Sequence, residues 1–84
     1  MGSMDTQHPF TLALARELRI ALDDSPLRFR KDLAEASGVP IRTLKRYLDG
    51  EREIPLTELR SIARALGVSV ASLIDCAEDR LGRD

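Results

Sequence analysis

Cysteine, histidine and aromatic residues are scarce in this chain of 84 residues, and each shortage excludes a class of site. Cys76 is the one cysteine and His8 the one histidine, so neither an internal disulfide nor a set of zinc ligands can form. We therefore expect no metal and no cofactor. The aromatic residues are Phe10, Phe29 and Tyr47, too few for the stacking surface on which single-stranded nucleic-acid binders rely.

Long apolar runs are also missing. No stretch approaches the roughly 18 apolar residues of a membrane-spanning helix, and no signal sequence opens the chain, so we expect a cytoplasmic protein. We interpret Met1 to Ser3 as a cloning remnant before a native start at Met4. An enzyme is not expected, because the serines have no histidine base and Asp23 and Asp24 have no further metal ligands beside them.

Length and composition indicate one small folded domain. A chain of 84 residues leaves no room for a second domain that senses a ligand or carries a catalytic site. Hydrophobic residues make up 43% and charged residues 32%, a balance typical of folded proteins rather than disordered chains. Because so short a chain buries only about 60 to 65% of its unfolded surface, a homodimer would be unsurprising.

Apolar residues recur every three or four positions, which predicts helices. We expect an all-α fold of five helices over residues 9–22, 29–37, 40–49, 55–66 and 69–77. These helices make up one domain of residues 9–77, between a flexible tail of residues 1–8 and a polar tail of residues 78–84. Gly38, Gly50 and Gly67 follow three of the helices, as expected of residues that end a helix in the left-handed conformation.

Each expected helix has an apolar face that we assign to the core. The inward residues are Leu14, Ala15, Leu18 and Leu22; Phe29, Leu33 and Ala34 or Ala36; Val39, Leu44, Tyr47 and Leu48; Leu59, Ile62, Ala63 and Leu66; and Val70, Leu73 and Ile74. We interpret Tyr47 as a core residue whose hydroxyl reaches a partner at the surface. Cys76 is interpreted as a small residue of the last helix, and His8 as an exposed residue of the tail.

The net charge of −1 conceals an uneven distribution. Residues 28–52 carry seven cationic and four acidic side chains, a charge of +3, whereas residues 1–27 and 53–84 carry −2 each. A basic segment between acidic flanks is typical of a phosphate-binding face. An ordinary solvated surface explains the same charges about as well. The choice between these two interpretations therefore depends on how the charged residues are arranged on the helices.

The two central helices supply that arrangement. Two short helices joined by a glycine-containing turn form a helix-turn-helix, whose second helix can enter the major groove of DNA. Helical spacing places Leu44, Tyr47 and Leu48 on the inner face of that helix. The opposite face carries Arg42, Lys45, Arg46 and Asp49. Three cations on one exposed face favour double-stranded DNA as the partner.

A longer pattern extends around these helices. It consists of Leu33-Ala34, Gly38-Val39, Thr43-Leu44, Arg46-Tyr47, Gly50 with Arg52, Pro55, and Ala65-Leu66-Gly67-Val68-Ser69. In this order and spacing, the chain from about Leu14 to Leu73 resembles the lambda-repressor-like, or Cro/XRE-type, helix-turn-helix regulators. The resemblance implies a compact lambda-repressor-like fold and a bacterial or phage transcription regulator, expected to be a repressor, that associates with the nucleoid through DNA.

The resemblance also assigns roles to single residues. The base-reading positions of the family fall on Ile41, Arg42 and Arg46, with Lys45 beside them, on a recognition helix from about Pro40 to Asp49. Phosphate contacts of the family fall on Arg30, at the start of the second helix, and on Arg52, just after the recognition helix. The free amides and partial positive charge of a helix N-terminus also favour a phosphate, and Arg30 and Lys31 would reinforce that contact. Thr43 could add a contact through its hydroxyl. Arg42 and Arg46 suit guanine, because arginine can donate to O6 and N7 together. A dimer would read an inverted-repeat operator.

Several residues depart from the family pattern. Arg30 stands where glutamine is usual, Phe29 and Pro40 replace small capping residues, and the loop 23–27 is about three residues longer than typical. Leu48 and Asp49 replace a common pair of glutamate and a polar residue before Gly50, and Glu51 and Glu53 are acids where cations are frequent, which could repel phosphate or steer the register on DNA. The alternative function is a protein-interaction module or antitoxin-type domain, with the same helical body and a partner docked on residues 68–81.

Overall fold

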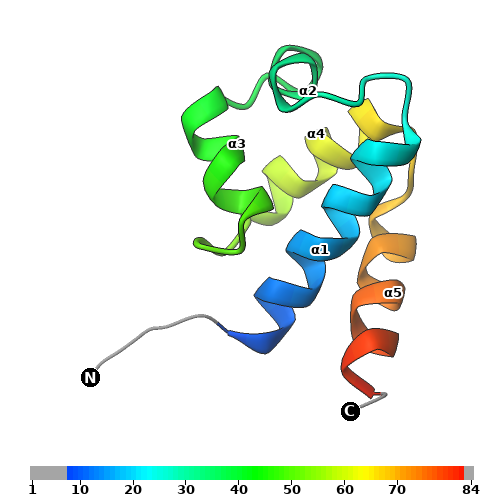
Figure 1. The fold of residues 1–84 in the computed structure, drawn as a ribbon. Helices are drawn as coiled ribbons and strands as arrows, with labels where there is room; N and C mark the ends of the chain where they lie inside the picture. Colours follow the sequence, from blue (N-terminus) through cyan, green and yellow to red (C-terminus); the bar gives the residue numbers. More distant parts are fainter. Residues whose placement is uncertain (1–7, 83–84) are drawn as a thin grey trace.

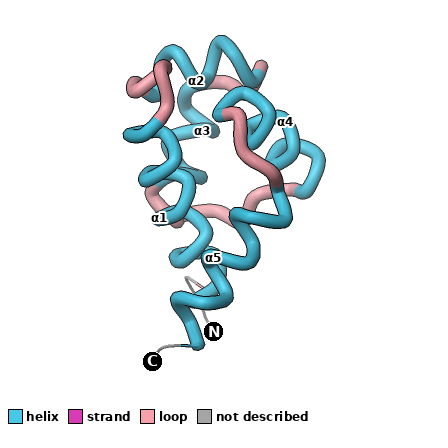
Figure 2. The backbone as a smooth tube through the Cα atoms, turned by 90° about the vertical axis from the view of Figure 1, so that its right-hand side faces the viewer, coloured by secondary structure: helices cyan, strands magenta, loops and turns pink. Residues whose placement is uncertain are grey.

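The computed structural model describes residues 8–82, which form five α-helices and no strand (Figure 1). The helices are α1 (Pro9–Asp24), α2 (Arg30–Ser37), α3 (Ile41–Leu48), α4 (Leu56–Leu66) and α5 (Val70–Gly82). Along the described range, helices alternate with loops (Figure 2). The expected all-α fold, with a helix-turn-helix at α2 and α3, is confirmed.

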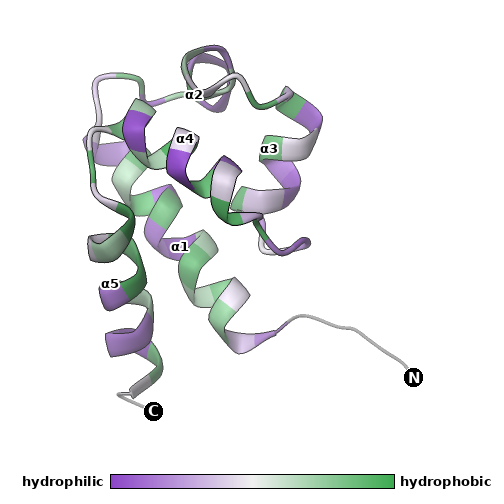
Figure 3. Cartoon of the chain, turned by 180° about the vertical axis from the view of Figure 1, so that it is seen from behind, coloured by the Kyte–Doolittle hydropathy of each residue, from purple (hydrophilic) through white to green (hydrophobic). Residues whose placement is uncertain are grey.

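The core lies where the helices meet. α1 packs beside α5 on one side and against α3 on another, and α2 packs on α3 and α4 (Figures 1 and 2). Hydrophobic and hydrophilic residues alternate along α1, α4 and α5, as in helices with one buried face (Figure 3). The largest fully buried side chains come from four helices and are Leu18, Leu33, Leu44, Leu48 and Ile62. α3 therefore supplies two of the five side chains at the centre of the core.

The last helix is longer than the sequence pattern predicts. α5 continues to Gly82, so the prediction of a polar tail from Glu78 is wrong for residues 78–82. Tertiary contacts sustain the extra turn: Ala77 is buried, Leu81 packs against the core, and Arg80 Nε donates to Glu17 Oε2 on α1 at 2.7 Å. The interpreted cloning remnant and the rest of residues 1–7, with residues 83–84, lie outside the described residues.

One prediction near the start of a helix is also wrong. Phe29, expected in the core, is 69% exposed, because it precedes α2 in an extended conformation and Leu33 fills the core beneath that helix. The choice between two alanines in α2 is decided as well, since Ala34 packs against the core and Ala36 is exposed. His8 is exposed, as expected, and it also caps α1 by accepting a hydrogen bond at Nδ1 from the amide of Phe10 at 3.2 Å.

Leu44→Ala tests the importance of α3 for the core. Leu44 is fully buried, so we expect the cavity to lower the free energy of unfolding by roughly 2 to 5 kcal/mol. The measurement is urea unfolding followed by circular dichroism. Lys45→Ala is the matched control, because Lys45 is exposed and its loss should change stability by less than about 0.5 kcal/mol. Equal stability of the two variants would contradict the assignment of Leu44 to the core.

Candidate nucleic-acid interface

A turn of three residues, Gly38 to Pro40, sets the direction in which α3 leaves α2. Gly38 has a φ of 79°, where a side chain would be strained, and its amide donates to the carbonyl of Ala34 at 3.0 Å. Val39 is buried, and its amide donates to Ser37 Oγ at 3.3 Å. Pro40 caps α3 at a φ of −56°, so the helix begins at Ile41, one residue later than expected.

α3 separates apolar and cationic side chains onto opposite faces. Leu44, Tyr47 and Leu48 are buried, which confirms the predicted inner face. The outer face is exposed and consists of Ile41, Arg42, Lys45 and Arg46. None of these three cations forms an ion pair with a residue in the described range, so their donors are available to an external partner.

Side chains from three other helices hold the C-terminal part of α3. The Tyr47 hydroxyl donates to the carboxylate of Glu58 on α4, and Arg19 Nη1 on α1 donates to the Leu48 carbonyl. Arg30 Nη2, at the start of α2, donates to Asp49 Oδ1 at 2.9 Å. These contacts add directional bonds to the apolar packing, so the outer face of α3 is held in one orientation relative to the core.

Gly50 turns the chain back toward α1 immediately after α3. It has a φ of 74°, and a Cβ at this position would lie 2.7 Å from Cδ2 of Leu12. The amide of Gly50 donates to the Tyr47 carbonyl at 3.1 Å. Both the left-handed backbone and the close approach to α1 therefore favour glycine here.

The phosphate-contact candidates lie around α3 in different environments. Lys31 and Arg52 are exposed, whereas Thr43 on α3 is half-buried. Arg30 is also half-buried, and its ion pair with Asp49 is a contact that the sequence analysis missed. No local pattern signals it, because 19 positions separate the two residues. The pair orients the Arg30 guanidinium toward the end of α3 but also places a carboxylate beside it.

The protein environment favours the neutral form of Tyr47. Burial raises the pKa of its hydroxyl above the ordinary tyrosine value, and the hydrogen bond to Glu58 and the negative charge of that carboxylate raise it further. The positive charge of Arg52 partly opposes this shift of the Tyr47 pKa. The expected hydroxyl partner of Tyr47 is thus Glu58 on α4.

The sequence of this helical body matches a known family. A family model described as helix-turn-helix matches residues 16–73, from α1 into α5 and over more than half of the chain. The chain belongs to the Cro/C1-type helix-turn-helix family. The match confirms the resemblance inferred from residues 14–73 and assigns the protein to the DNA-binding helix-turn-helix regulators. Comparisons with curated proteins and with solved structures give no significant match.

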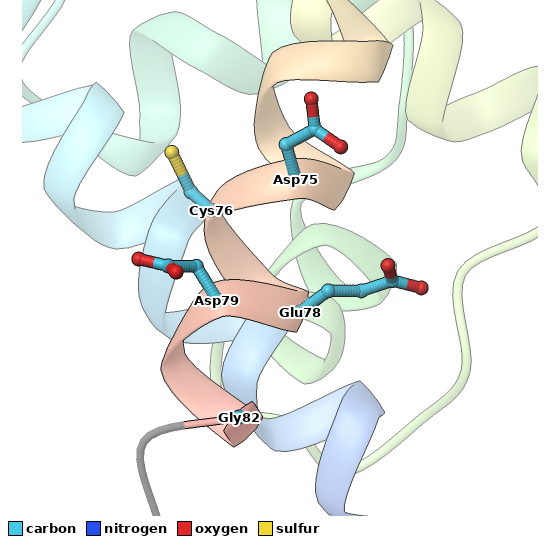
Figure 4. Close-up of a pocket in the computed structure, with 5 residues that line it drawn as sticks. All are labelled: Asp75, Cys76, Glu78, Asp79 and Gly82. Atoms are coloured by element: carbon cyan, nitrogen blue, oxygen red, sulfur yellow. The ribbon is translucent and has the colours of Figure 1, made fainter.

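Away from α3, this helix-turn-helix protein has an acidic surface on α5. A shallow pocket there is lined by Asp75, Cys76, Glu78, Asp79 and Gly82, all from the same helix (Figure 4). Cys76 is exposed, on the last helix as expected. Carboxylates on this surface of the helix-turn-helix fold repel phosphate, so this face of α5 is unfavourable for DNA.

No described helix is both long and apolar enough to cross a bilayer. No group of three or more histidine, cysteine, aspartate or glutamate residues among residues 8–82 is arranged to hold a metal ion.

Tyr47→Phe should change how the stability of this helix-turn-helix protein depends on pH. A folded-state pKa above the unfolded one gives a contribution that is present below the unfolded pKa, about 10, and is lost as the pH rises through the folded pKa. We therefore expect the parent to lose stability above about pH 10 more steeply than the variant, measured by urea unfolding at several pH values. Parallel curves would show that the Tyr47 hydroxyl titrates alike in both states.

Proposed function

We propose that this helix-turn-helix protein is a sequence-specific regulator that binds duplex DNA with α3 (Ile41–Leu48) and its capping residues Pro40 and Asp49 in the major groove. The separation of faces on α3 carries the proposal: one face packs in the core, and the other presents arginine and lysine side chains that form no ion pair with any residue among 8–82. The base-contacting residues are Ile41, Arg42, Lys45 and Arg46. Arg42 and Arg46 recognise guanine, and Ile41 contacts a thymine methyl group.

Residues of α2, of α3 and of the loop after α3 position the protein on the DNA backbone. Arg30 and Lys31 lie at the N-terminus of α2, whose free amides and partial positive charge favour a phosphate. Arg52, in the loop after α3, and the hydroxyl of Thr43 contact further phosphates. Such contacts fix register and supply most of the salt dependence, but they carry little sequence information.

The proposed operator is an inverted repeat bound by a homodimer. Two copies of α3 in successive major grooves, about 34 Å apart, would each read one half-site. Occupancy of such a site blocks access of RNA polymerase, so the proposed regulatory effect is repression.

Selection from a random duplex library tests this function. An enriched inverted repeat whose binding weakens steeply with salt would support a dimeric operator-binding regulator, and an enriched single half-site would support DNA reading by a monomer. Absence of both enrichment and low-salt binding would overturn the proposal. That result would favour the protein-interaction or antitoxin-type alternative, with residues 68–81 as the docking segment.

Arg46→Ala should relax the sequence preference at one base position. We expect a loss of about 1 to 3 kcal/mol in binding free energy on the selected operator and a smaller loss on an operator changed at that base. The readout is titration of both duplexes with parent and variant. Arg60→Ala on α4 is the control, because it removes an exposed arginine away from α3. An equal loss of binding free energy on both duplexes would show that Arg46 contacts a phosphate rather than a base.

Arg52→Ala should instead weaken binding to all sequences by a similar factor. The loss of one phosphate contact lowers the slope of log K against log salt concentration by about one. Titrations of the selected operator and an unrelated duplex at several salt concentrations measure both quantities. A changed base preference with an unchanged slope would contradict the phosphate role of Arg52.

A further inference from the structure

We propose that a pocket between α1 and the start of α2 is a phosphate-binding site. The pocket has a volume of about 400 Å³, and its cationic wall consists of Arg16, Arg19, Arg28 and Arg30. Asp23 is the one acidic residue among those that line it. We call this feature the arginine pocket. Arg16, Arg19 and Arg28 lie outside the residues assigned above to base or phosphate contacts.

Helical spacing and a strained loop bring these arginines together. Arg16, Arg19 and Asp23 lie on one face of α1, at intervals of three and four residues. Arg28 reaches the pocket from the loop after α1, with a φ of 61°, the one positive φ outside glycine among residues 8–82. A left-handed backbone at such a residue is costly and persists only where surrounding contacts hold it.

Ser25 supplies those contacts. It is buried, and its hydroxyl donates to the Leu22 carbonyl at 2.9 Å. The same oxygen accepts hydrogen bonds from the amides of Leu27 and Arg28 at 3.2 Å and 3.4 Å. The structure thus keeps an arginine in a conformation that glycine would adopt at lower cost.

The charges of the arginine pocket are only partly compensated. Arg19 donates to a neutral carbonyl, that of Leu48, and Arg30 pairs with Asp49. Neither Arg16 nor Arg28 forms an ion pair with any residue the structure describes. Neighbouring like charges destabilise the folded state, and a bound phosphate relieves that repulsion. The planar guanidinium groups suit its oxygens, because each can donate two parallel hydrogen bonds.

The position of the arginine pocket favours the DNA backbone as the source of the phosphate. Two of its arginines, Arg19 and Arg30, also contact the C-terminal end of α3, so the pocket adjoins the proposed interface. A free phosphate or pyrophosphate has the same chemistry and would occupy the same donors. The DNA source rests on the proposed function, whereas the site itself does not.

The test compares two double variants of the full chain. Arg16→Gln with Arg28→Asn removes two pocket arginines that form no ion pair with any residue among 8–82, and asparagine tolerates the left-handed backbone at position 28. Arg60→Gln with Arg64→Gln removes the same charge from exposed positions on α4 outside the pocket. Circular dichroism checks the fold. Each protein is titrated with pyrophosphate, and binding is detected by the shift in thermal unfolding and by the NMR signals of arginine side chains. Each protein is also titrated with the selected duplex at several salt concentrations.

Either of two results supports the site and identifies its ligand. With the DNA backbone as ligand, the salt slope of the pocket variant falls by about one to two relative to the control variant, while base preference is unchanged. With a free phosphate as ligand, pyrophosphate binds the parent saturably and binds the pocket variant at least tenfold more weakly, while the DNA slopes of the two variants agree.

Equal pyrophosphate responses of parent and pocket variant, together with equal DNA slopes of the two variants, would overturn the arginine pocket. Its failure can be told apart from failure of the proposed function. If the parent selects an operator and the pocket variant binds DNA and pyrophosphate as the control variant does, only the proposed phosphate site is refuted. If the parent binds pyrophosphate through the pocket but binds no duplex, only the proposed DNA-binding function is refuted.

Discussion

The packing of Leu44, Tyr47 and Leu48 under α3 is the interaction on which the rest of the interface depends. An isolated helix of eight residues is unstable in water, so α3 forms because its inner face is buried. That burial also leaves the outer face free for polar residues. The fold and the proposed DNA contact are thus two consequences of one amphipathic helix.

Polar contacts turn this packing into a defined orientation. Glu58, Arg19 and Arg30 reach the C-terminal part of α3 from three different helices. A base-reading side chain must meet a base edge within a few tenths of an ångström, and rigid support from neighbouring elements supplies that accuracy. The contacts also carry a cost, because Arg30 shares its charge with Asp49 and is less available to a phosphate.

The distribution of charge, rather than its total, governs which surface suits DNA. The chain carries a net charge of −1, yet the cations of α3 lie on one exposed face and the carboxylates of α5 on another. The arginine pocket enlarges the cationic area beyond α3 toward α1. An acidic remainder weakens nonspecific adhesion to nucleic acid, so the proposed DNA contacts are concentrated where α3 and the pocket meet.

The sequence alone determined the number of helices and the two faces of α3, because helical periodicity is local and Leu44, Tyr47 and Leu48 occur at its intervals. It also limited the chemistry, since a single histidine and a single cysteine exclude an internal disulfide and a set of histidine and cysteine ligands for zinc. Only the tertiary structure decided that Phe29 is exposed, that α5 runs on to Gly82, and that Arg30 pairs with Asp49. These features depend on contacts between segments far apart in the chain. Their energies are set by the relative positions of whole helices, which no local pattern encodes.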